Sequence, residues 1–163
     1  MAKSREALEE IVLSHHTMEH WHRRRVEVER WAEGQKVARR PKSVKWLKHD
    51  YVDEELYSVL SVLNQCGIST EYSCAGVSVL DDPEDHSLYA YLTFYDTDVA
   101  SSYVNYLMEK MKHRLMVIYE PARNRFDLSS FYIQHNRSFC LLLHYYTFQF
   151  FSDQKLSNKI TVT

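Results

Sequence analysis

The stretch that most constrains the fold carries signals for a helix, two strands and the turn between them. After Asp53, which we expect to cap the helix, leucines and valines recur at helical spacing, and Gly67 supplies a typical helix end. Residues 68–73 predict a strand, and residues 88–95 alternate in polarity and are rich in aromatic residues, as a half-buried partner strand is. We therefore predict helix 53–66 beside a pair of strands.

The turn after the first strand, Ser73-Cys74-Ala75-Gly76, is the most distinctive local sequence. Its small side chains let a ligand approach the backbone closely. Turns of this kind commonly hold phosphate groups, because exposed N–H groups converge on an anion. A tight loop without a ligand explains the same residues equally well.

The same kinds of signal predict the other segments. An N-terminal helix over 4–33 begins at Ser4 and ends at Gly34, and a helix over 98–113 is capped by Asp96 or Thr97. The further segments are a basic connector 35–52 with a short extended part near Trp46, a strand 115–120, strands 126–133 and 138–150 forming a hairpin, and a polar tail 152–163.

This order of elements predicts an α+β fold, with a mostly antiparallel sheet, helices on one face and a long N-terminal helix. We divide the chain into an N-terminal helical arm (1–40), a ligand-binding domain (41–151) and a C-terminal tail (152–163). The last predicted strand is too apolar for an exposed edge, which favours a central position or cover by another subunit.

Composition narrows the class of protein. The formal net charge of -2 argues against a general polyanion binder, although residues 21–48 hold ten Lys and Arg against three Glu. Three cysteines without framework spacing favour a reducing compartment. No apolar stretch is long enough to span a bilayer, and no signal peptide is evident, so we expect a cytoplasmic protein, in the host cytoplasm if the chain is viral.

Few residues form a recognised catalytic pattern. His16 and His20 have a spacing that can chelate zinc, but no further ligand follows them in a metal motif. Cys74 would need a histidine such as His86 or His144 nearby to act as a nucleophile, and a small residue in a tight turn is the simpler role. The acidic segment 81–85 is typical of a surface loop. We expect no catalytic residue, metal or cofactor.

Two arginines in a predicted turn are better candidates for binding. Arg123 and Arg125 follow a strand, and arginine suits bidentate phosphate contacts. Phe94, or a tyrosine of the same strand, would add a stacking plane for a base. The competing interpretation is that these arginines pair with Glu120 or Asp127 at the surface.

The phrase from Gly67 to Gly76 resembles the strand and Ser-Cys-x-Gly sequence of the Tyw3-like wybutosine-synthesis methyltransferases. The likeness covers about ten residues. It implies a tRNA-modifying enzyme that uses SAM, although Val77 stands where those proteins carry an Arg or similar residue.

The chain also resembles small phage proteins of the Thoeris anti-defence family in size and α+β build. Those proteins sequester signalling nucleotides, form oligomers and carry no catalytic apparatus. The resemblance implies a site that combines an aromatic residue with Asn and Arg, here Phe94, Asn105 and Arg123.

The sequence prediction is therefore non-enzymatic sequestration of a cyclic or ADP-ribose-like nucleotide by a homo-oligomer, with no membrane and no specific nucleic acid as partner. The alternatives are a Tyw3-like SAM enzyme and an inhibitor or regulatory subunit that binds another protein. The predicted ligand-binding residues are Tyr72, Ser73, Cys74, Gly76, Phe94, Asn105, Arg123, Arg125, Arg39 and Arg40.

Overall fold

The chain forms an α+β fold built on a five-stranded antiparallel sheet. The computed structural model describes residues 9–34, 42–78 and 87–160, with side chains described as far as residue 155. The sheet has the strand order β1-β6-β7-β5-β4, and each of its pairings is antiparallel. Its strands are β1 (Ile11–Val12), β4 (Thr70–Cys74), β5 (Tyr91–Tyr95), β6 (Met116–Glu120) and β7 (Arg125–Ser129). The predicted fold class and the pairing of the strands around residues 70–95 are confirmed.

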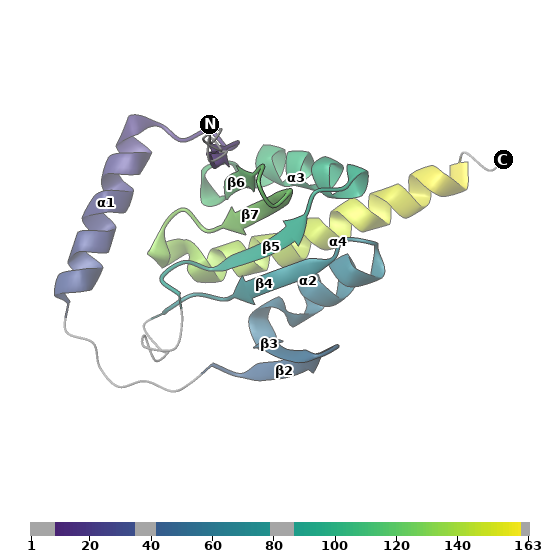
Figure 1. Ribbon diagram of the computed structural model, residues 1–163, viewed down its shortest axis with the longest axis horizontal. Helices are drawn as coiled ribbons and strands as arrows, with labels where there is room; N and C mark the ends of the chain where they lie inside the picture. The colour runs from purple at the N-terminus through teal and green to yellow at the C-terminus, as the bar shows by residue number, and fades with distance from the viewer. Residues whose placement is uncertain (1–8, 35–41, 79–86, 161–163) are drawn as a thin grey trace, which may run out of the picture.

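Three helices lie against one face of this sheet (Figure 1). They are α2 (Glu54–Gln65), α3 (Asp98–Met111), which a 3-10 turn over Lys112–Arg114 follows, and α4 (Asn136–Ile160). Leu92 and Phe94 of β5 belong to one core cluster with buried residues of all three helices. Because side chains alternate along a strand, Tyr91, Thr93 and their neighbours on β7 project from the other face. We call this second surface the open face.

The N-terminal helix is shorter than predicted. Helix α1 spans Met18–Glu33, and Thr17 caps it through a reciprocal capping box with His20. The predicted start at Ser4 lies outside the described residues. The prediction of helix across residues 9–17 is wrong, because Ile11 and Val12 pair with β6 as an edge strand. Helix α1 stands to one side of the sheet and of the other helices, and none of its residues is fully buried (Figure 1).

The last apolar run is a helix, which corrects the predicted strand 138–150 and its hairpin. Phe139, Leu143 and Phe150 are buried at helical spacing, while Leu141 and Tyr145 between them are exposed. The high β-propensity of the aromatic residues suggested a strand, but the buried positions recur every three to four residues, as they do along one side of a helix. Strand β7 pairs with β6 and β5 instead. The helix continues to Ile160, so most of the predicted loose tail is helical.

A separate hairpin lies next to helix α2. Strands β2 (Val44–Leu47) and β3 (Asp50–Asp53) pair antiparallel within the predicted basic connector. Asp53 precedes α2 as predicted, but its side chain makes no capping hydrogen bond. Among the described residues, none of the helices combines the length and the apolar character needed to cross a membrane.

Candidate functional site

The small turn at the end of β4 is shaped by a buried asparagine. Gly76 has φ +77°, and a β-carbon added there would come within 2.5 Å of Asn136 Nδ2 and 2.6 Å of the Ala90 nitrogen. The Ala75 N–H donates to Asp53 Oδ2 at 2.6 Å. Glycine is therefore required at position 76 by packing of the protein on itself. This accounts for Gly76, the last residue of the Ser-Cys-Ala-Gly turn, without a ligand.

Asn136, the first residue of α4, joins three segments of the chain. Its Nδ2 donates to the carbonyls of Val77 and Leu88 at 2.9 and 2.8 Å, and its Oδ1 accepts from the Ala90 N–H at 2.9 Å. The Ser130 hydroxyl also donates to Oδ1. The side chain thus fixes both ends of the segment that connects β4 to β5, and it holds them against the N-terminus of α4.

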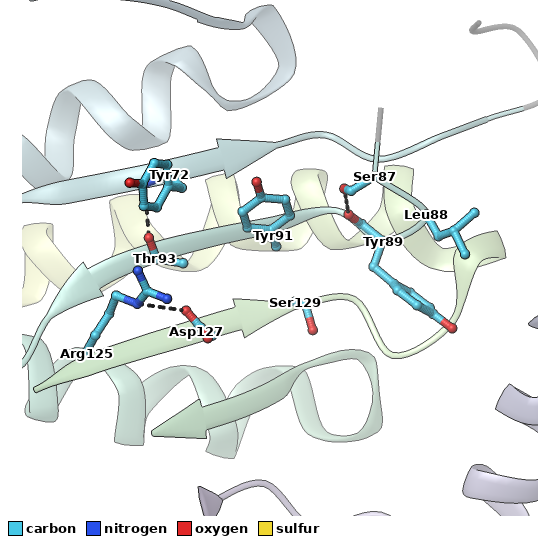
Figure 2. A pocket seen from close by; sticks show the side chains of 9 residues that line it. All are labelled: Tyr72, Ser87, Leu88, Tyr89, Tyr91, Thr93, Arg125, Asp127 and Ser129. Carbon is cyan, nitrogen blue, oxygen red and sulfur yellow. Dashed lines mark hydrogen bonds and ion pairs between the residues drawn. The ribbon is translucent and has the colours of Figure 1, made fainter. Parts of the chain in front are cut away.

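The open face carries a cavity of about 390 Å³, which we call the open-face pocket (Figure 2). Tyr72 of β4 and Tyr91 of β5 rise beside it, and Arg125 and Asp127 of β7 lie along its floor. Its remaining lining residues are Ser87, Leu88, Tyr89, Thr93 and Ser129. Of the predicted ligand-binding residues, the structure brings Tyr72 and Arg125 together here, with the guanidinium carbon 5.9 Å from the centre of the tyrosine ring.

Arg125 is occupied by carboxylates of the protein. Its Nη2 donates to both oxygens of Glu120 at 3.0 Å, and its Nη1 donates to Glu71 at 3.3 Å. The Arg125 side chain is only 8% exposed. The prediction of a phosphate clamp at Arg125 therefore gives way to the competing interpretation, an ion-pair cluster, because the guanidinium is already neutralised and buried.

Asp127 carries the least stabilised charge of this cluster. Its Oδ1 lies 3.4 Å from Arg125 Nε, yet neither buried atom makes a hydrogen bond among the described residues. Burial and the nearby carboxylate of Glu120 raise the pKa of Asp127 to about 7. The pKa of Glu120 is lowered, chiefly by its hydrogen bond with Asp127, so the proton that the two acids share resides on Asp127.

The other predicted site residues are scattered. Phe94 is fully buried in the core between sheet and helices, so it presents no ring face to a ligand. Asn105 is exposed on α3, in the layer on the other side of the sheet from the open face. The exposed Arg123 lies 3.8 Å from Glu120. Arg39, Arg40 and the acidic segment 81–85 lie outside the described residues.

A larger cavity, of about 700 Å³, lies between α1 and the rest of the protein, and we call it the α1 cavity. Helix α1 supplies Arg23, Glu27, Arg30 and Trp31, and the start of α4 supplies Arg137. Ala75, Val77 and Ser78 line it as well, so the predicted turn ends at this cavity. The other lining residues are Val26, Lys42, Glu55, Ile133, Gln134 and Asn136.

Positive charge dominates the wall of the α1 cavity. Glu27 accepts hydrogen bonds from the backbone N–H groups of Ile133 and Gln134, and Glu55 lies 3.7 Å from Lys42 Nζ. Among the described residues, Arg30 and Arg137 have no carboxylate within ion-pair distance. The cavity therefore presents guanidinium groups whose charge its own acids leave largely unbalanced.

Histidines join the N-terminal segment to the body of the protein. The His16 ring stacks on Phe131 at 4.0 Å, and the Ser14 hydroxyl lies 2.9 Å from His16 Nε2. Burial and neighbouring positive charge lower the pKa of His16 to about 4. Across the described ranges no group of three or more His, Cys, Asp or Glu is arranged to hold a metal ion. His16 and His20 instead serve in packing and helix capping.

Sequence reasoning missed most of the lining of the α1 cavity. The excess of basic residues in 21–48 was its one visible signal, and Trp31 within that run would have supplied the aromatic component. The contribution of Arg137 was hidden, because the sequence predicted a hairpin turn there and the structure has the first turn of α4. Asp127 was considered only as an ion-pair partner.

No protein-family model matches the chain, and comparisons with curated proteins and with solved structures found no match.

Proposed function

We propose that this protein binds a small phosphorylated nucleotide in the α1 cavity and sequesters it without chemical change. The observation that carries the proposal is a cavity of about 700 Å³ with arginines from two helices and a tryptophan in its wall. Cavities of about 300–1,000 Å³ are typical of small-molecule sites, so the volume suits a dinucleotide or an ADP-ribose-like ligand.

The cationic residues would contact the phosphates. Arg30 and Arg137 approach from α1 and α4, and guanidinium groups bind phosphate oxygens in bidentate pairs. The first turn of α4 adds the positive end of a helix dipole near Asn136. Trp31 offers an aromatic surface for a base or ribose.

The open-face pocket is less suited to phosphate. Its one arginine is held by Glu71 and Glu120, and Asp127 adds a further carboxylate at the floor. An anion placed there would meet more negative than positive charge. The nucleotide proposal therefore uses the α1 cavity, rather than the Tyr72 and Arg125 pairing that the sequence suggested.

Sequestration, rather than catalysis, is proposed from the resemblance to Thoeris anti-defence proteins. A homo-oligomer and a cytoplasmic location belong to the same proposal. Tight binding of this kind requires a pocket formed in advance and no chemical step. The exposed apolar side chains Leu141, Tyr145 and Phe148 on α4 are compatible with contact between subunits.

The test is a thermal-shift screen against cyclic dinucleotides, cyclic ADP-ribose isomers, NAD, ADP-ribose and SAM. A ligand that binds the native state raises the melting temperature in a concentration-dependent way. We expect a shift with a phosphorylated nucleotide that is recovered intact. A shift with SAM alone would select the methyltransferase alternative, and recovery of an altered ligand would exclude sequestration.

Two substitutions locate the binding. Arg30→Ala and Arg137→Ala should each weaken nucleotide binding about tenfold, the usual effect of removing a charge-assisted hydrogen bond. Arg25→Ala is the matched control, because it removes the same charge from α1 but does not line this cavity. Equal weakening by all three variants would point to a general charge effect and count against a specific site.

A further inference from the structure

The open-face pocket has a lining that the nucleotide proposal does not use. Three tyrosines surround it, and Tyr72 is 56% exposed. Tyr72 and Tyr91 rise from neighbouring strands on the same side of the sheet as Asp127 (Figure 2). The part of the chain that the structure describes shows no hydrogen bond from the Tyr91 or Ser129 hydroxyl. The pocket is therefore an aromatic hollow whose floor holds the carboxylate of Asp127 beside the guanidinium of Arg125.

The side chains in this region include more acidic groups than basic groups. The cluster contains the carboxylates of Glu71, Glu120 and Asp127 around the buried guanidinium of Arg125, and the exposed Arg123 lies 3.8 Å from Glu120. Two of these acids hydrogen-bond Arg125, whereas Asp127 contacts it only at Nε, without a hydrogen bond. Among the described residues, an ionised Asp127 consequently shares its nearby cation, Arg125, with Glu71 and Glu120.

A tyrosine ring of this protein already makes a cation–π contact with an arginine of the same chain. The Arg24 guanidinium lies 3.9 Å from the centre of the Tyr89 ring. The faces of tyrosine rings attract cations through the ring quadrupole, and aromatic cages with a nearby carboxylate recognise alkylammonium groups. In the pocket, the Arg125 guanidinium carbon lies 5.9 Å from the centre of the Tyr72 ring, which leaves the other face of Tyr72 and the ring of Tyr91 for a ligand from outside.

We propose that the open-face pocket is a second binding site, for a small organic cation whose ammonium group lies between the rings of Tyr72 and Tyr91 and beside the carboxylate of Asp127. This site is independent of the proposed nucleotide site and differs from it in the sign of its charge. A cavity of about 390 Å³ admits a ligand of one short alkylammonium chain or one small ring.

The protonation of Asp127 provides a signature of such binding. Burial and Glu120 raise its pKa to about 7, and the charged groups that face it are Glu120 on β6, Arg125 on its own strand and Glu10 before β1, with the Tyr91 phenol on β5. A bound cation favours the ionised form. Binding should therefore release a proton near neutral pH and weaken as Asp127 becomes protonated.

The experiment is an NMR titration of the ¹⁵N-labelled full chain with choline and with 3,3-dimethyl-1-butanol, its uncharged carbon isostere. We expect choline to shift the amides near Tyr72, Tyr91 and Asp127, with affinity about tenfold lower at about pH 6 than at about pH 8. The isostere should bind at least about tenfold more weakly, because it lacks the cation–π attraction. Equal binding of the two compounds, or no saturable shift with choline, would overturn the proposal.

Variants assign the effect to the pocket. Asp127→Asn should lower choline affinity and abolish its pH dependence, while Asp153→Asn, the same change at an exposed position on α4, should leave both unchanged. Tyr72→Leu changes an exposed side chain that the fold does not require, and it should weaken choline binding several-fold. Unaltered binding in both Asp127→Asn and Tyr72→Leu would contradict the assignment, and the amide spectrum of each variant reports whether it is folded.

Discussion

The side chain of Asn136 occupies the space beside Gly76 that a β-carbon would fill. The glycine also has a positive φ of 77°, a conformation that is costly for other residues. These two residues lie 60 positions apart in the sequence, and their contact joins the end of β4 to the start of α4. Both lie beside the α1 cavity, since Val77, Ala75 and Asn136 line it.

Gly76→Ala should destabilise the protein by about 2–4 kcal/mol, because the new methyl group meets the Ala90 backbone as well as Asn136. Gly67→Ala is the control. Gly67 also has a positive φ, 86°, but nothing lies within 4 Å of an added β-carbon. That variant should lose only about 1–2 kcal/mol of free energy of unfolding, as the cost of backbone strain. Urea unfolding of the two variants measures the difference, and equal losses would show that the contact with Asn136 is unimportant.

Asn136→Ala should cost about 2–4 kcal/mol in the free energy of unfolding. The substitution leaves the Ala90 N–H and the carbonyls of Val77 and Leu88 buried without their partner. Asn105→Ala provides the matched change at an exposed position of α3 and should be nearly neutral. Hydrogen exchange of the Ala90 amide should accelerate only in the first variant. If that amide stays protected in Asn136→Ala, the anchoring role assigned to Asn136 is wrong.

Asp127→Asn should stabilise the protein at alkaline pH and have little effect near pH 5. The pKa of Asp127 is raised to about 7 in the folded protein, above its usual value near 4, so ionisation of this group destabilises the fold as pH rises through that interval. Asparagine carries no charge at any pH. Melting temperatures of the two proteins, measured between about pH 5 and pH 8, should diverge by several degrees toward the upper end. Parallel curves would mean that Asp127 is ionised at little cost.

Acid should loosen the attachment of the N-terminal segment and α1. The pKa of His16 is lowered to about 4 in the folded protein and that of His135 likewise, so stability should be lost progressively as pH falls below about 6.5. Protonation of His16 would place a positive charge in a partly desolvated position close to His20 and Arg24. Trp21, whose ring centre is 5.8 Å from that of His16, reports the change by fluorescence. His16→Phe keeps the stacking on Phe131 and should lessen the loss; an unchanged acid transition in that variant would exclude this role for His16.

Local sequence signals predicted the middle of the fold well and its ends poorly. The apolar periodicity predicts helix α2, the small residues ending in Gly76 predict the turn after β4, and Thr97 predicts the start of helix α3. Each of these signals acts over a short distance in the sequence. Helix α4 was mistaken for a strand, because its aromatic residues have high β-propensity and only their burial pattern reveals the helix. The start of α1 was misplaced because pairing of Ile11 with Tyr119 depends on contacts distant in sequence.

The candidate site was only partly accessible to the same reasoning. Tyr72 and Arg125 were both selected from the sequence and do meet on the open face, but the role of Arg125 depends on Glu71 and Glu120, which the folded sheet places around it. The α1 cavity joins Trp31 to Arg137, more than a hundred residues further along the chain as numbered. No local motif connects two such positions.

The most direct test of the nucleotide proposal is the indole N–H region of a ¹H–¹⁵N spectrum during titration with ADP-ribose and with a cyclic dinucleotide. The chain has three tryptophans; Trp31 lines the α1 cavity, whereas Trp46 lies exposed on the β2–β3 hairpin. The Trp31 signal, assigned by its loss in Trp31→Phe, should shift in a saturable way while that of Trp46 stays fixed. A saturating nucleotide that leaves Trp31 unmoved, or no saturable shift with either ligand, would contradict binding in the α1 cavity.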